Sequence, residues 1–279
     1  MRSRKIVTAF VLAMFASACS ACSSSASDSD SLVARADGRN HLTIGTRFDQ
    51  PGLSERKLDG QIVGFDVDVA KFVAAELGVS PGNITWRETT PNTRETDLSS
   101  GAVDLVATTY SITDKRKQLV SFAGPYFVTG QDLLVRQTSA DITGPESMNG
   151  RKLCSQPGTT SAQQVRDRFA MAVQLVEYPR FPDCVTALLA GQVDAVTTDA
   201  AILAGYVTQN PELLRVVGKP FSTERYGIGL RKGDVEGHTA VTNAIEKMID
   251  NKTWAASLNA NIGPSGYPLP QPPEVNERP

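Results

Sequence analysis

Two stretches of this chain follow the same pattern, and that internal repeat constrains the fold most strongly. LSSGAVDLVATTY begins at residue 98, and LLAGQVDAVTTDA begins at residue 188. Each contains the end of a helix, a glycine turn, Val-Asp and a short apolar strand that finishes in threonines. The repeat therefore predicts two similarly built lobes.

Short apolar runs alternate with helical patterns along the rest of the chain. The clearest helix is FDVDVAKFVAAELG at residues 65–78, where apolar residues recur on one face. Alternation of this kind is typical of α/β proteins with a largely parallel sheet. Because ligands of open α/β sheets bind at the carboxyl ends of strands, facing lobes would place Thr108 and Thr109 on one wall of a cleft and Thr198 and Asp199 on the other.

The first residues predict export. MRSRK is positively charged, and the apolar run after it is too short to span a bilayer, so residues 1–18 are predicted to be a signal peptide. Small residues before a cysteine in ASACSAC resemble a bacterial lipidation site, with Cys19 as the acylated residue and Cys22 as the alternative. A plain secretory signal is the alternative to a lipoprotein. Residues 19–40, which begin with a serine-rich run, are expected to be a flexible tether.

Charge and cysteine content restrict the function further. A formal net charge of −2 offers no basic surface for nucleic acid. In an exported protein, Cys154 and Cys184 are most simply a disulfide. The two histidines, His41 and His238, do not stand at ligand spacing from a cysteine, so no metal or other cofactor is predicted. No catalytic or nucleotide-binding motif is present, which favours a binding protein over an enzyme.

Features of the chain suit an amino-acid ligand. TTYSITDKRK leads from a strand into a helix capped by Ser111 or Thr113, and Arg116 could grip a carboxylate there. SQPGTTSAQQV, residues 155–165, is a second loop and helix start rich in hydroxyls. Its backbone N–H groups could bind the same kind of anion, and it is here called the second anion loop. Asp199 suits an ammonium group, although it could equally cap a helix. Each feature alone is ordinary, but together they match the two charges of an α-amino acid.

Several segments resemble a known family. GFDVDVAKFVAAELG, VDLVATTYSITDKRKQLVSFAGPYF and GQVDAVTTDAAIL are similar to extracellular solute-binding proteins that deliver polar amino acids to ABC importers. The resemblance implies the α/β type II periplasmic-binding-protein fold, with a ligand cleft between two lobes joined by two crossover strands. It predicts lobe 1 at residues 41–131 plus 225–262 and lobe 2 at 132–224. Residues 263–279 are expected to form a proline-rich tail, extended and unpacked.

The resemblance also assigns ligand-binding roles. Arg116 and Ser111 would hold the α-carboxylate, helped by the backbone near Thr160. Asp199 and the Thr109 carbonyl would hold the ammonium group. Phe65 would pack on the aliphatic part of the ligand. The complete set of residues expected at the site is Arg47, Phe48, Phe65, Arg94, Thr108, Thr109, Ser111, Arg116, Gln156, Thr159, Thr160 and Asp199.

Arg47, at the end of the first strand, favours an acidic ligand. Glutamine-binding members commonly have an aspartate at that position, and a lysine where Gln156 stands here. Members that bind glutamate or aspartate carry an arginine matching Arg47 and an asparagine–arginine pair, which reads Thr93-Arg94 in this chain. Two unpaired guanidiniums would be costly in a closed cleft, and a side-chain carboxylate would satisfy both.

The sequence therefore predicts a monomeric receptor, lipid-anchored to the outer face of the cell membrane. It would close over glutamate, or aspartate in second place, and deliver it to the membrane subunits of an ABC importer. The alternatives are a glutamine or asparagine receptor, a sensor that acts on a membrane signalling protein and, least favoured, a cyclohexadienyl dehydratase. The Cys154–Cys184 disulfide would join the strand before the second anion loop to a neighbouring helix.

Overall fold

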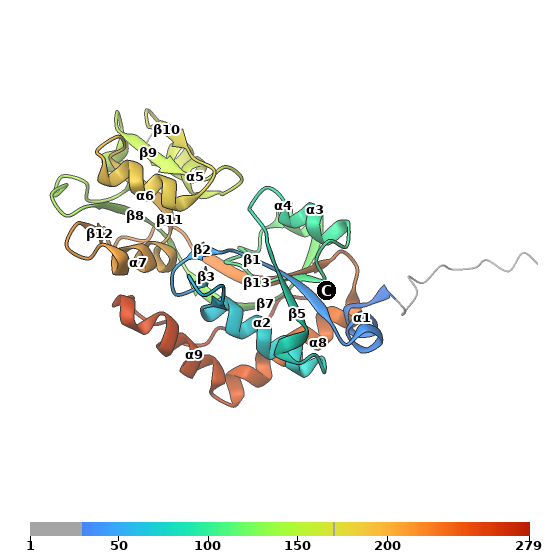
Figure 1. Ribbon diagram of the computed structural model, residues 1–279. Helices are drawn as coiled ribbons and strands as arrows, with labels where there is room; N and C mark the ends of the chain where they lie inside the picture. Colours follow the sequence, from blue (N-terminus) through green and yellow to red (C-terminus); the bar gives the residue numbers. More distant parts are fainter. Residues whose placement is uncertain (1–29, 170) are drawn as a thin grey trace, which may run out of the picture.

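The computed structural model describes residues 30–169 and 171–279 (Figure 1). The predicted signal peptide and both candidate lipidation sites, Cys19 and Cys22, lie outside these residues. In this described part of the chain, no helix combines the length and apolarity needed to cross a bilayer.

The first lobe is built on a five-stranded sheet. Its strands, in sheet order, are β5 (Ile84–Glu88), β1 (Leu42–Thr46), β6 (Leu105–Val106), β13 (Glu224–Arg231) and β7 (Val120–Thr129). The first three are parallel, and β13 is antiparallel to both β6 and β7. A small antiparallel sheet of β2 (Asp49–Gln50), β3 (Ser54–Arg56) and β4 (Ile62–Val63) follows β1.

Helices cover both faces of this sheet (Figure 1). One group packs together beneath it, namely α1 (Leu32–Arg39), α2 (Phe65–Glu76), α8 (Val235–Asp250) and α9 (Thr253–Asn261). The short helices α3 (Arg94–Ser99) and α4 (Asp114–Lys117) lie at the other face. The 3₁₀ turns are η2 (Pro81–Asn83), η3 (Pro145–Met148) and η4 (Gly263–Ser265).

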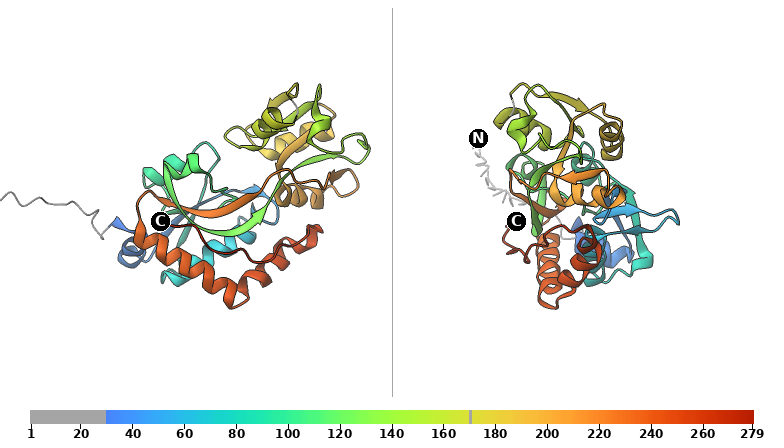
Figure 2. Two further views of the ribbon diagram at one scale, coloured as in Figure 1. Left: turned by 180° about the vertical axis from the view of Figure 1, so that it is seen from behind. Right: turned by 90° about the vertical axis from the view of Figure 1, so that its left-hand side faces the viewer.

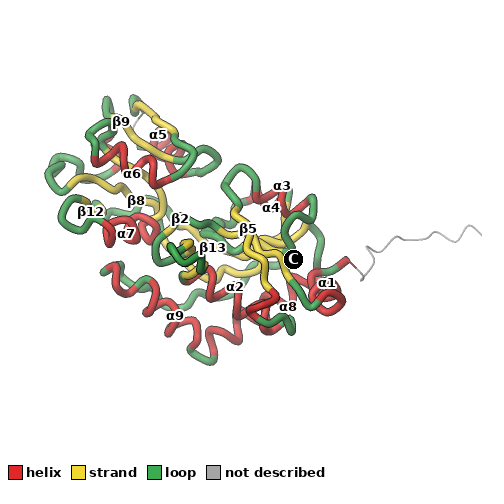
Figure 3. Tube along the Cα trace, in the orientation of Figure 1, coloured by secondary structure: helices red, strands yellow, loops and turns green. Residues whose placement is uncertain are grey.

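The second lobe repeats this plan. Its sheet order is β10 (Gln174–Glu177), β9 (Lys152–Ser155), β11 (Ala195–Asp199), β8 (Gln131–Arg136) and β12 (Leu214–Val216). The helices α5 (Ser161–Arg168), α6 (Phe181–Leu189) and α7 (Ala200–Gln209) pack against it. Figure 3 shows the two groups of strands as separate bodies joined by few connections.

Two strands carry the chain between the lobes. β7 ends at Thr129 and β8 begins at Gln131, so the chain passes directly from one sheet into the other. The return passes from β12 into β13, which pairs along β7 in the first sheet. The prediction of two lobes joined by two crossover strands is confirmed.

Residues 30–40, predicted as part of a flexible tether, are instead ordered and carry helix α1. The Ser31 side chain caps this helix by accepting a hydrogen bond from the Ala34 N–H. Leu32 and Ala36, one turn apart, are buried, and the Leu32 N–H donates to Asp234 before α8. The tether prediction was wrong here because a capped apolar face outweighs the polar composition.

The tail predicted as unpacked, residues 263–279, is extended but packed against lobe 1. The Tyr267 hydroxyl lies 2.7 Å from the Thr129 hydroxyl at the end of β7. The Glu277 side chain is only 7% exposed. Figure 2 shows this segment, in dark red, returning from the end of α9 toward lobe 1. Its prolines exclude regular structure, but they do not prevent side-chain contacts with the sheet.

Candidate ligand-binding site

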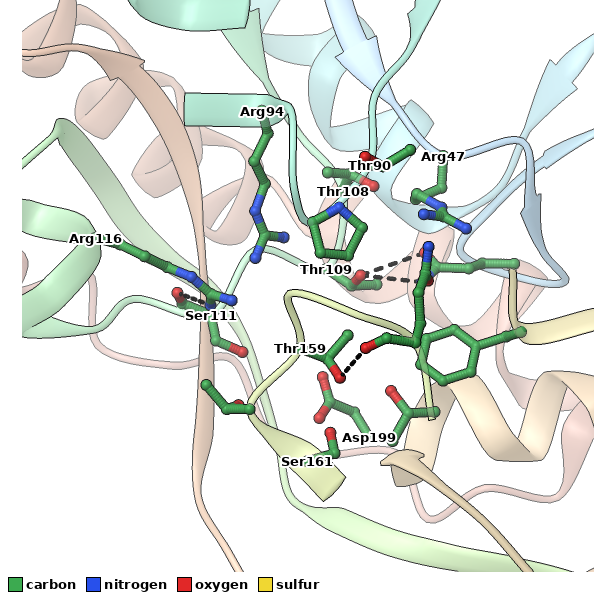
Figure 4. Close-up of a pocket in the computed structure, with 16 residues that line it drawn as sticks. Arg47, Thr90, Arg94, Thr108, Thr109, Ser111, Arg116, Thr159, Ser161 and Asp199 are labelled. Atoms are coloured by element: carbon green, nitrogen blue, oxygen red, sulfur yellow. Dashed lines mark hydrogen bonds between the residues drawn. The ribbon is translucent and has the colours of Figure 1, made fainter. Parts of the chain in front are cut away.

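A polar pocket lies between the lobes, where strands of both sheets end. β1 and β6 end at it in lobe 1, and β11 ends at it in lobe 2, as expected for ligand sites of α/β sheets. The lining residues are Arg47, Gln50, Thr90, Pro91, Arg94, Thr108, Thr109, Ser111, Arg116, Gln156, Thr159, Thr160, Ser161, Phe181, Thr198 and Asp199 (Figure 4).

All but two of the predicted site residues line this pocket, and the two exceptions are the phenylalanines. Phe65 is fully buried in the core of lobe 1, with its ring centroid 5.6 Å from that of Phe127 and 5.7 Å from that of Trp254. Phe48 lies under the Arg56 guanidinium, 3.9 Å from the ring centroid. The prediction that Phe65 packs on the ligand was wrong because its side of α2 faces the core.

Phe181, the first residue of α6, is an aromatic residue that does line the pocket, unlike Phe65. It is 2% exposed and comes from lobe 2. The residues that sequence reasoning left out of the site are Gln50, Thr90, Pro91, Ser161 and Phe181, whereas Thr198 lines the pocket beside Asp199 as the strand ends predicted. The predicted disulfide could have indicated that Phe181 lies near the pocket. It ties Cys184, on the same helix, to Cys154 on the strand before the second anion loop.

Arg47 is not the unpaired guanidinium that the sequence predicted. Its Nε donates to Asp49 Oδ1 at 2.9 Å and its Nη2 to Asp49 Oδ2 at 2.6 Å. Two groups from lobe 2 meet the same aspartate, since Arg180 Nε donates to Oδ2 at 3.2 Å and the Tyr206 hydroxyl donates to the backbone carbonyl at 2.6 Å. Of the three guanidinium nitrogens of Arg47, Nη1 is the one that is buried without a hydrogen-bond partner among the described residues.

Arg94 and Arg116 lie side by side over one ring. The Arg94 guanidinium is 3.8 Å and that of Arg116 is 5.4 Å from the centroid of Tyr110. Glu95 Oε1 lies 3.6 Å from Arg94 and 3.8 Å from Arg116, and it accepts a hydrogen bond from the Tyr110 hydroxyl. Burial and the adjacent Arg116 charge lower the pKa of Arg94 to about 9. This shortage of negative charge suits an anionic ligand.

Arg94 is the less satisfied of these two arginines. It is 4% exposed, and its Nε has no hydrogen-bond partner in the described part of the chain. Arg116, by contrast, donates from Nη1 to the Ser111 carbonyl at 2.8 Å. A buried guanidinium without a hydrogen-bonded carboxylate is unfavourable unless a ligand completes it.

Only one of the two predicted helix starts faces the pocket. Thr160 precedes α5 and does not cap it, since its hydroxyl accepts from the Gln131 amide at 3.0 Å. The first N–H groups of α5 can therefore receive a carboxylate. The other start is capped by Thr113, whose hydroxyl accepts from the Arg116 N–H, and Thr113 does not line the pocket.

Asp199 lies on the wall opposite the arginines (Figure 4). It stands at the N-cap position of α7, but its side chain makes no capping hydrogen bond. Its Oδ2 accepts from the Tyr226 hydroxyl at 2.6 Å. Burial and the nearby Glu224 charge raise the pKa of Asp199 to about 7. A cationic ligand group would stabilise the ionised carboxylate.

Thr109 has a backbone conformation that requires support. Its φ is +43°, a region that β-branched residues rarely adopt. Its N–H donates to Asp66 Oδ2 at 2.8 Å, while Asp66 Oδ1 accepts from the Tyr126 hydroxyl at 2.8 Å. Burial raises the pKa of Asp66 to about 7. Asp66 therefore positions the Thr109 backbone at the pocket without lining it.

The predicted disulfide between Cys154 and Cys184 is present and joins β9 to α6. It fixes two pocket residues relative to each other, because Gln156 follows β9 and Phe181 begins α6. Gln156 Nε2 donates to the Pro179 carbonyl at 2.6 Å, and its Oε1 is buried without a partner among the described residues. The disulfide thus supports the lobe 2 wall of the pocket.

Known proteins share this fold and sequence. The chain is 44% identical over 253 residues to the glutamate-binding protein GluB of Corynebacterium glutamicum, covering 87% of this chain and 85% of that protein. It is 36% identical over 207 residues to a glutamine-binding protein of Geobacillus stearothermophilus, covering 74% and 78%. A solved ancestral arginine-binding protein bound to glutamine matches with a TM-score of 0.75 and 34% identity, over 81% of this chain and 99% of that one.

The family match covers most of the described chain. The model of the bacterial extracellular solute-binding proteins, family 3, matches residues 42–264, which include both sheets and every residue that lines the pocket. These are binding proteins rather than enzymes, as the missing catalytic motifs predicted. The two-lobed architecture, the interlobe pocket and the sequence match agree that the chain belongs to the bacterial extracellular solute-binding proteins of family 3.

Proposed function

We propose that this protein captures glutamate, or aspartate in second place, between its lobes and delivers it to the membrane subunits of an ABC importer. The observation that carries the proposal is the pair of guanidiniums, Arg94 buried and Arg116 partly buried, opposite the Asp199 carboxylate, which makes no capping hydrogen bond. Family membership makes it an exported protein. Attachment to the membrane through a lipid on Cys19, or on Cys22, is part of the proposal.

The pocket offers complementary groups for each part of an α-amino acid. The α-carboxylate would lie between Arg116 and the first N–H groups of α5. The ammonium group would lie between Asp199 and the carbonyl of Thr109, which accepts no hydrogen bond in the described part of the chain. Phe181 would contact the aliphatic carbons.

The side chain of the ligand would complete the remaining donors. Arg47 Nη1 and Arg94 Nε are both buried and unpartnered within the described residues. A side-chain carboxylate supplies the negative charge needed to pair with Arg94, whereas an amide supplies only a neutral acceptor oxygen. The glutamate-binding relative is 44% identical to this chain and the glutamine-binding relative 36%, which supports the same choice.

Glutamine is the second candidate, and the Arg47–Asp49 pair favours it. Because Asp49 already neutralises Arg47, the remaining Nη1 can donate to an amide oxygen as well as to a carboxylate. The glutamine-binding relative is consistent with this alternative.

Isothermal titration calorimetry of the mature protein tests the proposal. We expect glutamate to bind at least about tenfold more tightly than glutamine, a difference of about 1.4 kcal/mol. Tight binding of glutamine with no response to glutamate would exclude the acid-specific function. Asp199→Asn should weaken binding of every amino acid, because each presents an ammonium group.

Transport and sensing are separated by a cellular measurement. Cells that lack this protein should lose high-affinity uptake of radiolabelled glutamate, and the wild-type chain should restore it. Normal uptake with a lost transcriptional response to glutamate would support a sensor instead. We propose that the moving bodies are residues 41–131 with 225–262, and residues 132–224.

A further inference from the structure

The C-terminal segment Tyr267–Glu277, here called the strap, runs along the crossover strand β7. At one end, the Tyr267 hydroxyl lies 2.7 Å from that of Thr129, the last residue of β7. At the other end, the Glu277 N–H donates to the Gly124 carbonyl at 2.9 Å. The family match stops at residue 264, before the strap begins, so the family comparison does not account for it.

Glu277 is the charged anchor of the strap. Its carboxylate accepts from Lys117 Nζ at 2.8 Å and lies 3.5 Å from Arg225 Nη1. Asn276 Oδ1 adds a hydrogen bond from Arg225 Nη2 at 2.6 Å. Hydrogen bonding to Glu277 raises the pKa of Lys117. A carboxylate that is only 7% exposed is rare in proteins unless it is paired, and Lys117 and Arg225 supply the pairing here.

The two residues that pair with the Glu277 carboxylate, Lys117 and Arg225, lie beside the segment 111–116 of the pocket. Lys117 follows Arg116 in α4, a helix of only four residues that has little stability of its own. The Arg225 carbonyl accepts from the Ile112 N–H at 2.8 Å, next to Ser111. The strap therefore holds both ends of the segment that carries Ser111 and Arg116.

We propose that Glu277 is a positioning residue for ligand binding. Acting through Lys117 and Arg225, it fixes the segment Ser111–Arg116 in its ligand-binding geometry before the ligand arrives. This inference rests on the proposed function only in assigning the α-carboxylate to that segment. Fixing the segment in advance reduces the entropy lost on binding and so increases affinity.

Hydrogen exchange of the ligand-free protein tests the strap without reference to any ligand. Glu277→Gln removes the charge and keeps the size, and we expect faster amide exchange in peptides that cover residues 111–119. Glu274→Gln is the matched control, because Glu274 lies in the same strap and is exposed. Unchanged exchange of residues 111–119 in Glu277→Gln would overturn the proposal.

Calorimetry with L-glutamate tests the consequence for binding. We expect Glu277→Gln and Lys117→Gln each to raise the Kd about five- to tenfold, and the double variant to be no weaker than either single variant. Glu277→Asp, which keeps the charge, should recover most of the affinity and is also the fallback if Glu277→Gln fails to fold. A lower melting temperature with an unchanged Kd would show that Glu277 serves only the fold.

The two proposals fail in different ways. If the wild-type protein does not respond to glutamate, the proposed function is wrong, and the exchange measurement still decides whether the strap holds residues 111–119. If glutamate binds equally well to the wild type and to Glu277→Gln, the strap proposal alone is wrong.

Discussion

At the end of β1, Arg47 shows how a tertiary partner changes the role of a side chain. The bidentate pairing with Asp49 neutralises its charge and leaves one nitrogen for a ligand. The unmet positive charge of the pocket lies instead on Arg94, which has no carboxylate of residues 30–169 or 171–279 within hydrogen-bonding distance. Under the proposed function, Arg94 is therefore the residue that we expect to distinguish a carboxylate from an amide.

Replacing Arg94 with methionine should separate binding from stability. We expect the Kd for glutamate to rise about 10- to 150-fold, because a charge-assisted hydrogen bond contributes about 1.5–3 kcal/mol. The melting temperature of the ligand-free protein should stay the same or rise, since a buried, poorly paired cation is removed. Calorimetry and thermal unfolding measure the two effects.

The matched control for that variant is Arg87→Met. Arg87 lies on β5 of the same lobe and is 53% exposed. It should leave the Kd for glutamate unchanged. A drop in melting temperature for Arg94→Met with normal affinity would assign Arg94 to the fold instead of the ligand.

Asp199 should make glutamate affinity depend on pH. Its pKa in the ligand-free fold is about 7, so the carboxylate that receives the ammonium group is ionised above this pH. Affinity should therefore be highest above about pH 7 and fall up to about tenfold for each unit below it. Titrations between about pH 5.5 and about pH 8.5 measure the profile, and a constant Kd over this range would contradict the assignment.

The same group affects stability with a defined sign. Because the folded state raises the pKa of Asp199 from 3.8 to about 7, the ligand-free fold binds this proton more tightly than the unfolded chain does. The contribution of Asp199 to the free energy of unfolding therefore decreases as the pH rises from about 4 to about 7. Asp66, whose pKa is also raised, acts in the same direction. Bound glutamate should offset the part of this pH dependence that is due to Asp199, because its ammonium group stabilises the ionised carboxylate.

Among the elements, α6 depends on the disulfide for its position at the pocket. Cys184 lies one turn beyond Phe181 on this helix, and Cys154 lies on β9, which leads to Gln156. The covalent bond therefore ties the helix that presents Phe181 to the strand before the anion loop. Noncovalent packing of α6 supplies the rest of the contact.

Removing the disulfide should lower stability more than affinity. The bond closes a loop with a sequence separation of 30 residues, so its loss should reduce the free energy of unfolding by about 3–4 kcal/mol on the chain-entropy model. The variant carries both Cys154→Ser and Cys184→Ser, and urea unfolding gives the value. Wild-type protein unfolded in a reductant should match this variant, whereas identical midpoints for oxidised and reduced protein would contradict the prediction.

At the scale of the whole molecule, the two lobes touch beside the pocket. Arg180 and Tyr206 of lobe 2 both donate to Asp49 of lobe 1. Gly158 of lobe 2 lies so close to Asn92 that an added Cβ would be 2.1 Å from its side-chain oxygen. The lobes are therefore in direct contact, and Asp49 connects these interlobe contacts to Arg47, which lines the pocket.

Arg180→Ala should weaken closure without removing a ligand contact. Arg180 is half exposed and does not line the pocket, so its ion pair with Asp49 contributes only about 0.5–1 kcal/mol. We expect the Kd for glutamate to rise about two- to fivefold, mainly through faster dissociation as closed molecules become less populated. Stopped-flow measurements give the rate, and the exposed Arg168→Ala on α5 is the control.

Sequence reasoning succeeded where a property depends on neighbours along the chain. The repeat at residues 98 and 188 predicted two lobes, and the strand ends placed Thr109 and Asp199 at one pocket. It failed where a residue interacts with a partner that is remote in sequence, or where the direction of a side chain decides whether the residue faces the core or the pocket. Phe65 belongs to a correctly predicted helix, yet periodicity does not show that its ring packs on Trp254 rather than on the ligand.

The sequence by itself determined the α/β class and the two lobes, because helix caps, periodic apolar residues and strand ends are local properties of short segments. The cysteine content of an exported chain predicted the disulfide, and the family resemblance supplied most of the pocket lining. Only the tertiary structure decided which charges remain unmet: Arg47 is neutralised by Asp49, while the nearest carboxylate oxygen to Arg94 in the described chain, on Glu95, is 3.6 Å away. It also decided that the tail forms a strap, since Glu277 is buried only when residues remote in sequence, Lys117 and Arg225, meet it. Pairing energies depend on distance and burial, and folding sets both.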